Sequence, residues 1–307
     1  MSEQPRFMLI ASSQMESNPV FDRAAALAKA HGAALHIVVF DYLEGLVTAN
    51  LVNEDVREAL QASYVERHRS WLEDQARPLR ELGGTITTEV IWVDEPLDEI
   101  LIHLREQPMD ALIKGLEYQS RLSRMIFTPL DIHLLRECPT PLHFVSHAKH
   151  ALPRRILAAV DPFHRDGRYQ DFNDRILHEA VKLATACDAR VDVLYAHDLS
   201  SISSAEFGFD DGSAFFSSKV AKTLFEAQGE AFNELADRNS IPPEQRHMIM
   251  GAPANVLSAY ASAHDIDVVV MGRVGHRKPG RLVGSTVESL LYKVPCSIWV
   301  IAPELLD

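Results

Sequence analysis

The sequence has few cysteines and no long apolar run, and both shortages restrict what the protein is. Only three of its 307 residues are cysteines, Cys138, Cys187 and Cys296, and each adjoins an apolar stretch. This small, odd number argues against a disulfide framework and is typical of reduced, mostly buried thiols. No run of about eighteen apolar residues is present, and the N-terminus lacks the basic-then-apolar order of a secretion signal. We therefore expect a cytoplasmic protein without membrane insertion.

Positive charge is scarce as well. Lys and Arg number 30 against 43 Asp and Glu, so the formal net charge is −13. A charge of this sign repels nucleic acid and anionic membranes at long range, and we expect neither as a partner. The rest of the composition is that of a globular protein, because 47% of the residues are hydrophobic. The length suggests about two domains.

The chain reads as two copies of one pattern, offset by about 150 residues. Each copy opens with an apolar strand, at residues 6–11 in the first and 155–160 in the second. An Ala-rich helix follows at residues 23–31 and 176–187, and after a second strand a long helix follows at residues 54–82 and 213–238. A third strand comes next in both copies. Each copy then has a helix with a proline near its start, a buried strand that ends at Gly115 or Gly272, and a last strand after a proline.

This alternation predicts an α/β fold of two tandem doubly wound domains, each a five-stranded parallel sheet flanked by helices. A polar stretch with a proline at residues 147–153 marks the boundary, so we expect domains over residues 1–149 and 150–307. Because the linker is short, we expect the halves to pack as an intramolecular pseudo-dimer that covers apolar edges. Ligands are expected at the carboxyl ends of the strands.

The most specific pattern lies in residues 268–286 of the second copy. Three valines and Met271 form a buried strand that runs into Gly272, and Gly275 follows after two further residues. After eight further residues, Gly284 begins a Gly-Ser-Thr triplet that opens the next helix. The first two glycines let the backbone turn sharply near a ligand, and a helix start offers unpaired N–H groups to an anion. The segment therefore predicts a phosphate site, although it matches neither the P-loop nor the dinucleotide pattern.

These features make the chain similar to the universal stress protein family, in particular to its tandem two-domain members. The resemblance covers nearly the whole chain, and its most specific parts are the glycine pattern and residues 126–139 of the first copy. Family members that bind ATP have a similar glycine pattern with a middle loop one residue longer. The resemblance implies ATP, with or without Mg²⁺, or a related adenine nucleotide as the ligand of the second domain. It implies Asp161, Ala196 and Met271 beside the base and ribose, and Gly272, Arg273, Gly275, Gly284, Ser285 and Thr286 around the phosphates.

The first copy departs from this pattern. Proline at a helix start removes a backbone donor, and a tyrosine adds bulk where a phosphate needs room. We interpret the first domain as a degenerate nucleotide site that is either purely structural or a pocket for a more apolar ligand. The departures are Ser12 in place of Asp161, Tyr118 in place of Gly275, and Thr128-Pro129 in place of Gly284-Ser285.

Structural roles without a ligand stay open for several of these residues. Ser285 and Glu288 fit a capping box, and Gly272 fits a turn at the end of a strand. Asp161, which precedes a proline, fits a cap of the following turn. The cations of residues 273–281 fit either phosphate contact or a solvated surface.

Patterns for metal binding and catalysis are weak. His143, His147 and His150 are spaced like helical metal ligands but fall on a predicted strand and linker, so we expect no metal site. No residue is an evident general base and no carboxylate pair is dedicated to Mg²⁺, so any ATP hydrolysis is expected to be slow.

Three functions stay open. The first is a cytoplasmic stress-response protein that binds an adenine nucleotide in its second domain and acts as a sensor or regulator. The second is a slow ATPase that uses the same pocket. The third is a nucleotide-free scaffold or binding module that holds an apolar ligand in its first domain. The sequence names no protein partner, and a homodimer is compatible with all three.

Overall fold

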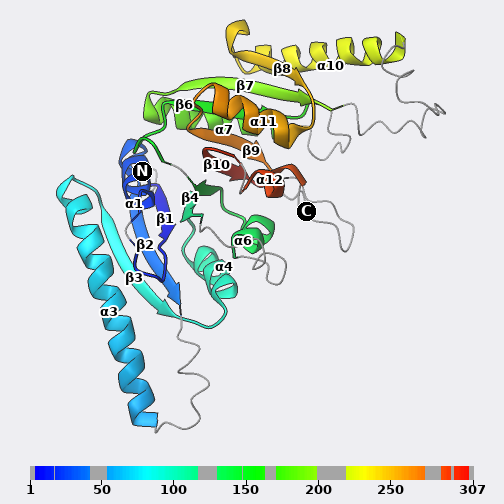
Figure 1. Ribbon diagram of the computed structural model, residues 1–307. Helices are drawn as coiled ribbons and strands as arrows, with labels where there is room; N and C mark the ends of the chain where they lie inside the picture. The colour runs from blue at the N-terminus through cyan, green and yellow to red at the C-terminus, as the bar shows by residue number, and fades with distance from the viewer. Residues whose placement is uncertain are drawn as a thin grey trace. The chain divides into compact units, whose positions relative to one another are not determined.

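The computed structural model describes residues 4–16, 18–41, 54–116, 130–146, 148–162, 171–198, 219–273, 285–291 and 294–303. The chain forms two compact units, Met1–Leu152 and Pro153–Asp307. Within the described ranges each unit has five strands and four α-helices (Figure 1). None of the helices in these ranges combines the length and the apolar character that a bilayer crossing requires.

The sheet of unit 1 is parallel throughout, in the order β3-β2-β1-β4-β5. Its central strands are apolar on both faces, as a parallel sheet between two layers of helices requires. Leu9, Ile37 and Ile113 are completely buried. The strands are β1 (Arg6–Ile10), β2 (Ala34–Asp41), β3 (Ile86–Trp92), β4 (Ala111–Gly115) and β5 (Leu142–Val145).

Unit 2 repeats this arrangement with a second parallel sheet, in the order β10-β9-β6-β7-β8. Strand β9 contains Val268, Val269 and Val270, which are completely buried, and this burial explains the run of valines in the sequence. The strands are β6 (Arg155–Val160), β7 (Arg190–His197), β8 (Arg246–Met250), β9 (Val268–Gly272) and β10 (Ser297–Ile301).

Helices connect the strands in both units. In unit 1 they are α1 (Val20–Ala30), α3 (Glu54–Glu81), α4 (Pro96–Glu106) and α6 (Leu130–Glu137). In unit 2 they are α7 (Phe172–Cys187), α10 (Lys219–Arg238), α11 (Pro253–Ala263) and α12 (Ser285–Leu290), and a 3₁₀ turn at Pro243–Gln245 precedes β8.

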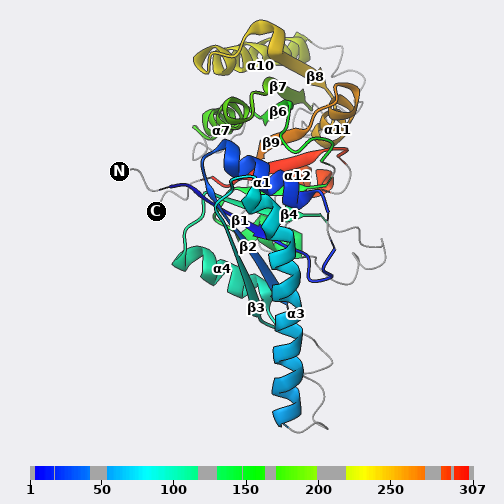
Figure 2. The ribbon, with the colours of Figure 1, turned by 90° about the vertical axis from the view of Figure 1, so that its left-hand side faces the viewer.

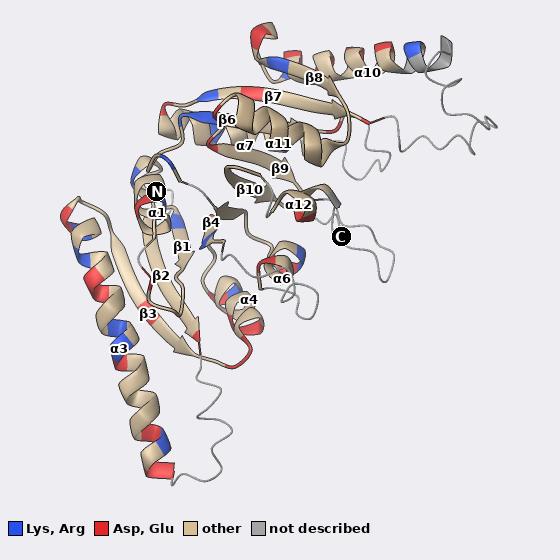
Figure 3. Cartoon of the chain, in the orientation of Figure 1, with Lys and Arg blue, Asp and Glu red and all other residues tan. Residues whose placement is uncertain are grey.

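Helix α3 is longer than the sheet that it covers. Its buried residues, which include His68 and Leu72, lie in its second half, whereas Val56 and Leu60 near its start are exposed. Figure 2 shows the first half of α3 extending past the ends of the strands. Acidic and basic residues are mixed along its length (Figure 3), as is typical of a solvated helix face.

The α/β class predicted from the sequence, with two tandem five-stranded parallel sheets, is confirmed. Both Ala-rich helices begin earlier than the apolar pattern indicates, α1 at Val20 and α7 at Phe172. The predicted helix over residues 213–238 is described from Lys219 onward. The three cysteines are buried, as expected.

Candidate functional site at the carboxyl edge of each sheet

The strand order of unit 2 contains one reversal, between β6 and β9. From β6 the chain moves outward through β7 to β8, and it then returns to the other side of β6 as β9. Open α/β sheets bind ligands at such a switch point, outside the carboxyl ends of the two central strands. Asp161 directly follows β6, and Gly272 ends β9. Two of the predicted site residues therefore flank the switch point.

Asp161 is exposed, and its backbone is fixed by a side chain that sequence reasoning missed. The N–H of Asp161 donates to Asn173 Oδ1 at 2.9 Å, and Asn173 Nδ2 donates to the Asp161 carbonyl at 2.8 Å. This reciprocal pair ties the end of β6 to the first turn of α7. Burial, and then the negative charge of Asp161, raises the pKa of Tyr195 on β7.

Two predicted base-contacting residues lie on the strands beside Asp161. Ala196 is half-buried near the end of β7, and Met271 is 5% exposed in β9. Met271 is in register with Ala159 of β6 and Val300 of β10. Apolar side chains at this edge suit the flat surface of a nucleobase. Their contact with a base stays a prediction.

Gly272 has a packing reason to be glycine. A Cβ atom added there would lie 2.3 Å from Cε1 and 2.6 Å from Cζ of Phe172, and 3.0 Å from Cδ1 of Ile176. Helix α7 therefore lies so close to the end of β9 that position 272 has no room for a Cβ atom. The glycine at this position is explained by the fold, and its contact with a phosphate remains a separate prediction.

The predicted phosphate side is partly described. The backbone N–H of Arg273 donates to the Ile301 carbonyl at 2.9 Å, so this donor extends the pairing of β9 with β10. This backbone donor is therefore already satisfied within the sheet. Thr286 is half-buried in the first turn of α12. The predicted residues outside the described set are Gly275, Gly284 and the side chain of Ser285.

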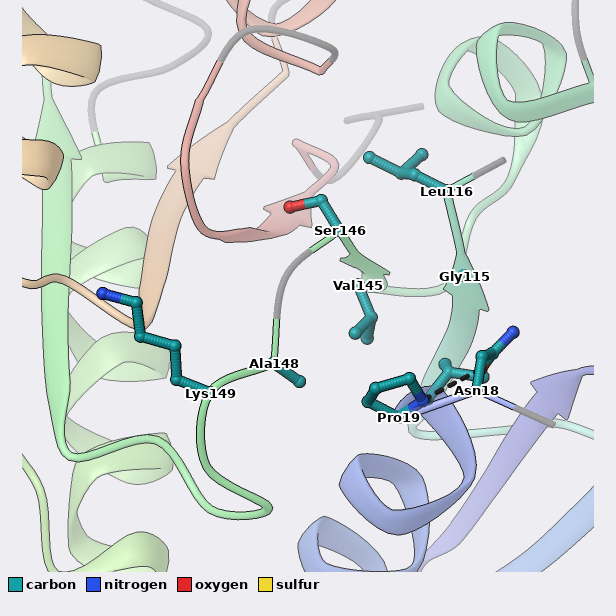
Figure 4. A pocket seen from close by; sticks show the side chains of 9 residues that line it. Asn18, Pro19, Gly115, Leu116, Val145, Ser146, Ala148 and Lys149 are labelled. Atoms are coloured by element: carbon teal, nitrogen blue, oxygen red, sulfur yellow. Dashed lines mark hydrogen bonds between the residues drawn. The ribbon is translucent and has the colours of Figure 1, made fainter. Parts of the chain in front are cut away.

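Unit 1 has a cavity of about 450 Å³ at the corresponding edge of its own sheet (Figure 4). The ends of β4 and β5 and the start of α1 line it. The backbone N–H of Val20 donates to Asn18 Oδ1 at 3.0 Å, so this donor at the helix start is already satisfied. The apolar lining residues are Pro19, Val20, Leu116, Val145 and Ala148, and the others are Asn18, Gly115, Ser146 and Lys149.

A buried ion pair lies next to this cavity and was not anticipated from the sequence. Lys114 Nζ and Asp131 Oδ1 are 2.9 Å apart, and the two side chains are only 11% and 6% exposed. Lys114 precedes the last glycine of β4 as Met271 precedes the last glycine of β9. A lysine in an otherwise apolar strand was the available signal, since a buried cation needs a partner.

Comparisons with known proteins agree with this architecture. The family model described as "Universal stress protein family" matches residues 8–146 and again 153–302. Universal stress protein E of Salmonella typhi is 24% identical over 309 aligned residues, which cover 99% of this chain and 96% of that protein.

Two solved structures share the fold over nearly the whole chain. One is a universal stress protein from Pseudomonas aeruginosa, with a TM-score of 0.72 and 23% identity over 98% of this chain and 94% of that one. The other is a universal stress protein from Archaeoglobus fulgidus, with a TM-score of 0.65 and 17% identity over 97% and 96%. Some family members bind adenine nucleotides, since one was solved in complex with cAMP and another with dAMP. Because the family model matches both units, the chain belongs to the universal stress protein family.

Proposed function

We propose that unit 2 binds ATP or a related adenine nucleotide at the switch point between β6 and β9, and that this binding makes the protein a sensor or regulator in a stress response. Unit 1 does not bind the nucleotide. It serves as a structural partner or holds a different ligand.

The position of Asp161 and Met271 carries the proposal. Both lie at the ends of adjacent strands on either side of the switch point, and in the sequence the Gly275 and Gly284 pattern follows Gly272. A buried apolar strand end suits the base, and an exposed carboxylate suits hydrogen bonding by ribose hydroxyls or base amino groups.

Calorimetric titration with ATP and Mg²⁺ tests the site. The variant Gly275→Tyr/Gly284→Thr gives unit 2 the residues that unit 1 has at Tyr118 and Thr128. We expect one site per wild-type chain and at least a roughly tenfold loss of affinity in the variant, because bulk and lost backbone approach exclude the phosphates. Equal affinity in both proteins contradicts the assignment.

Two further variants sharpen this test. The reverse change in unit 1, Tyr118→Gly/Thr128→Gly, is a matched control that leaves the affinity and the stoichiometry unchanged. Asp161→Ala weakens ATP binding but leaves binding of inorganic triphosphate unchanged, because the carboxylate serves the base and ribose end. Equal losses for both ligands would place Asp161 at the phosphates instead.

The cavity of unit 1 favours a second candidate function, the binding of a small, mainly apolar molecule. It is lined largely by apolar side chains, and Figure 4 shows Val145 pointing toward Pro19 across it. A volume of about 450 Å³ is in the range of ligand pockets. Mass spectrometry of gently purified protein is the test: Val145→Trp, which fills the cavity, removes a co-purifying apolar ligand, whereas Ile301→Trp at the matching position of unit 2 does not.

A further inference from the structure

Three metal-ligating side chains converge in unit 1, nearer the amino ends of its strands than the cavity. His36 is the third residue of β2, Glu89 lies in the neighbouring strand β3, and His103 lies on α4. His36 Nε2 and Glu89 Oε2 are 3.1 Å apart. The rings of His36 and His103 stack with their centroids 5.4 Å apart and their planes at 7°. One ligand atom from each residue lies within 4.8 Å of the other two.

His103 supplies the observation that points to a ligand. His103 is only 7% exposed, and its Nε2 has no hydrogen-bond partner among the described residues. Buried ring nitrogens are normally paired, because leaving one unpaired sacrifices its hydration without compensation. A cation bound between the three side chains would satisfy this nitrogen.

His36 is oriented for coordination through Nε2. Its Nε2–H donates to Glu89 Oε2 at 3.1 Å, and its Nδ1, 2.8 Å from Thr87 Oγ1, accepts from that hydroxyl. A metal ion between Nε2 and Oε2 would replace this proton, and the Thr87 hydroxyl would then accept from Nδ1–H. The Glu89 side chain is 45% exposed, so an ion reaches the group from solvent.

We propose that His36, Glu89 and His103 form a binding site for a divalent transition-metal ion of the zinc class. Two imidazoles and one carboxylate are a ligand set that Zn²⁺ takes, and three protein ligands leave a fourth position for water. Ligand atoms of a tetrahedral zinc site are about 3.4 Å apart for bonds of about 2.1 Å. The present ligand atoms lie within 4.8 Å of one another, so binding of an ion requires the three side chains to close to that spacing.

Unit 2 carries a natural comparison at the same three positions. Asp192 is the third residue of β7, as His36 is of β2, and Tyr260 is the eighth residue of α11, as His103 is of α4. The register places His247 opposite Leu194, as it places Glu89 opposite Val38. The counterparts of His36, Glu89 and His103 are therefore Asp192, His247 and Tyr260.

The counterpart in unit 2 is arranged as an ion pair. Arg190 Nη2 lies 3.0 Å from Asp192 Oδ1, so a cation already neutralises the carboxylate. Burial and the charge of Asp192 raise the pKa of Tyr260, which keeps the phenol protonated and a poor metal ligand. His247 Nε2 is 3.5 Å from the same carboxylate oxygen. The two units thus use one location in two ways.

Metal titration of the full-length, metal-free protein tests the proposal. Zn²⁺ is added in competition with a chromophoric chelator, and Co²⁺ is added while its visible absorption reports the coordination geometry. We expect one ion per chain, and an affinity at least about tenfold weaker in Glu89→Gln and in His103→Gln, because each removes one ligand. His247→Gln, at the matched position of unit 2, leaves the affinity unchanged.

The two substitutions differ in how much they are expected to destabilise the fold. Glu89→Gln is nearly isosteric at a partly exposed position, so it retains the fold even if the buried His103→Gln does not, and circular dichroism checks both. Wild-type protein that binds no Zn²⁺, unchanged affinity in Glu89→Gln, or an equal loss in His247→Gln each overturns the proposal. The readout uses the metal alone and is therefore independent of nucleotide binding.

Discussion

Strands β4 and β9 hold the same place in their units, beside the first strand. The residue before the glycine that ends each strand differs in charge between the two. In unit 2 this residue is Met271, and in unit 1 it is Lys114, which forms the buried ion pair with Asp131. The counterpart of Asp131 in unit 2 is the buried Val287. An apolar pair in one unit is thus replaced by a charged pair in the other.

The difference shows that one fold accommodates two kinds of side-chain pair at one location. A nucleobase needs an apolar wall, which Met271 offers beside the switch point of unit 2. The ion pair in unit 1 instead places charge at that position, and the start of α1 lines the nearby cavity. The backbone is preserved in both cases, because register and strand order are the same. Side chains at the strand ends, and not the topology, distinguish the two sites.

Breaking the ion pair should have the largest effect. Asp131→Asn leaves Lys114 buried without a counter-charge, and removal of one partner of such a pair typically costs about 3–5 kcal/mol. We expect the free energy of unfolding to fall by that amount, measured by urea denaturation with the transition of unit 1 followed separately if the two units unfold in sequence.

Giving unit 1 the residues of unit 2 is the control. Lys114→Met/Asp131→Val replaces both charges by apolar groups, so most of the lost stability should return, because apolar substitutes for a buried ion pair are often neutral or stabilising. If the double variant is as unstable as Asp131→Asn, the cost comes from packing and not from an unpaired charge.

The glycines that end β9 and β4 give a second comparison, in which we expect a change in stability of intermediate size. Gly272→Ala places a methyl group 2.3 Å from the Phe172 ring, and we expect a loss of about 1–3 kcal/mol from overpacking. In unit 1 the nearest atoms to a Cβ on Gly115 are 3.8 Å away, so Gly115→Ala should be neutral or slightly stabilising. Thermal unfolding of the two variants side by side measures the difference.

A rescue variant identifies the contact. Phe172→Leu removes the part of the ring nearest to residue 272, so it should recover stability in the Gly272→Ala background while destabilising the wild type. Equal stabilities of Gly272→Ala and Gly115→Ala would show that α7 moves away at little cost.

The smallest effect concerns the long helix of unit 1. Glu73 on α3 accepts hydrogen bonds from Arg80 Nη1 at 2.6 Å and from the hydroxyl of Thr88 on β3. These bonds, those of Arg80 first, lower the pKa of Glu73 to about 2 from 4.5. The Glu73 side chain is 41% exposed, so solvent screening limits its contribution, and we expect Glu73→Gln to cost at most about 1 kcal/mol at pH 7.

The pH dependence gives this prediction its sign. A carboxyl group whose pKa is lower in the folded state contributes stability fully above its unfolded pKa and loses it as the pH falls through the folded value. The difference between wild type and Glu73→Gln should therefore be constant above about pH 5 and shrink between pH 4.5 and 2. A difference that persists unchanged at pH 2.5, measured by urea denaturation, would show that the carboxylate charge is not responsible.

Much of the fold was predictable because its signals are local. The valines of β9 and the apolar run of β2 mark buried parallel strands, and Pro96 and Pro253 mark helix starts that the structure confirms. The starts of α1 and α7 were predicted too late, since the Ala-rich pattern begins after the first turn. Predicted contacts of Gly275 and Gly284 lie outside the described residues and stay predictions.

The sequence by itself determined the two copies, their parallel sheets and the edge at which Asp161 and Gly272 lie, because periodicity, glycine and proline act through neighbouring residues. Only the tertiary structure decided that Asn173 holds Asp161, that Phe172 requires Gly272, and that Lys114 meets Asp131. It also brought His36, Glu89 and His103 together from two strands and a helix. These contacts join residues far apart in the chain, and no local pattern encodes the packing that places them side by side.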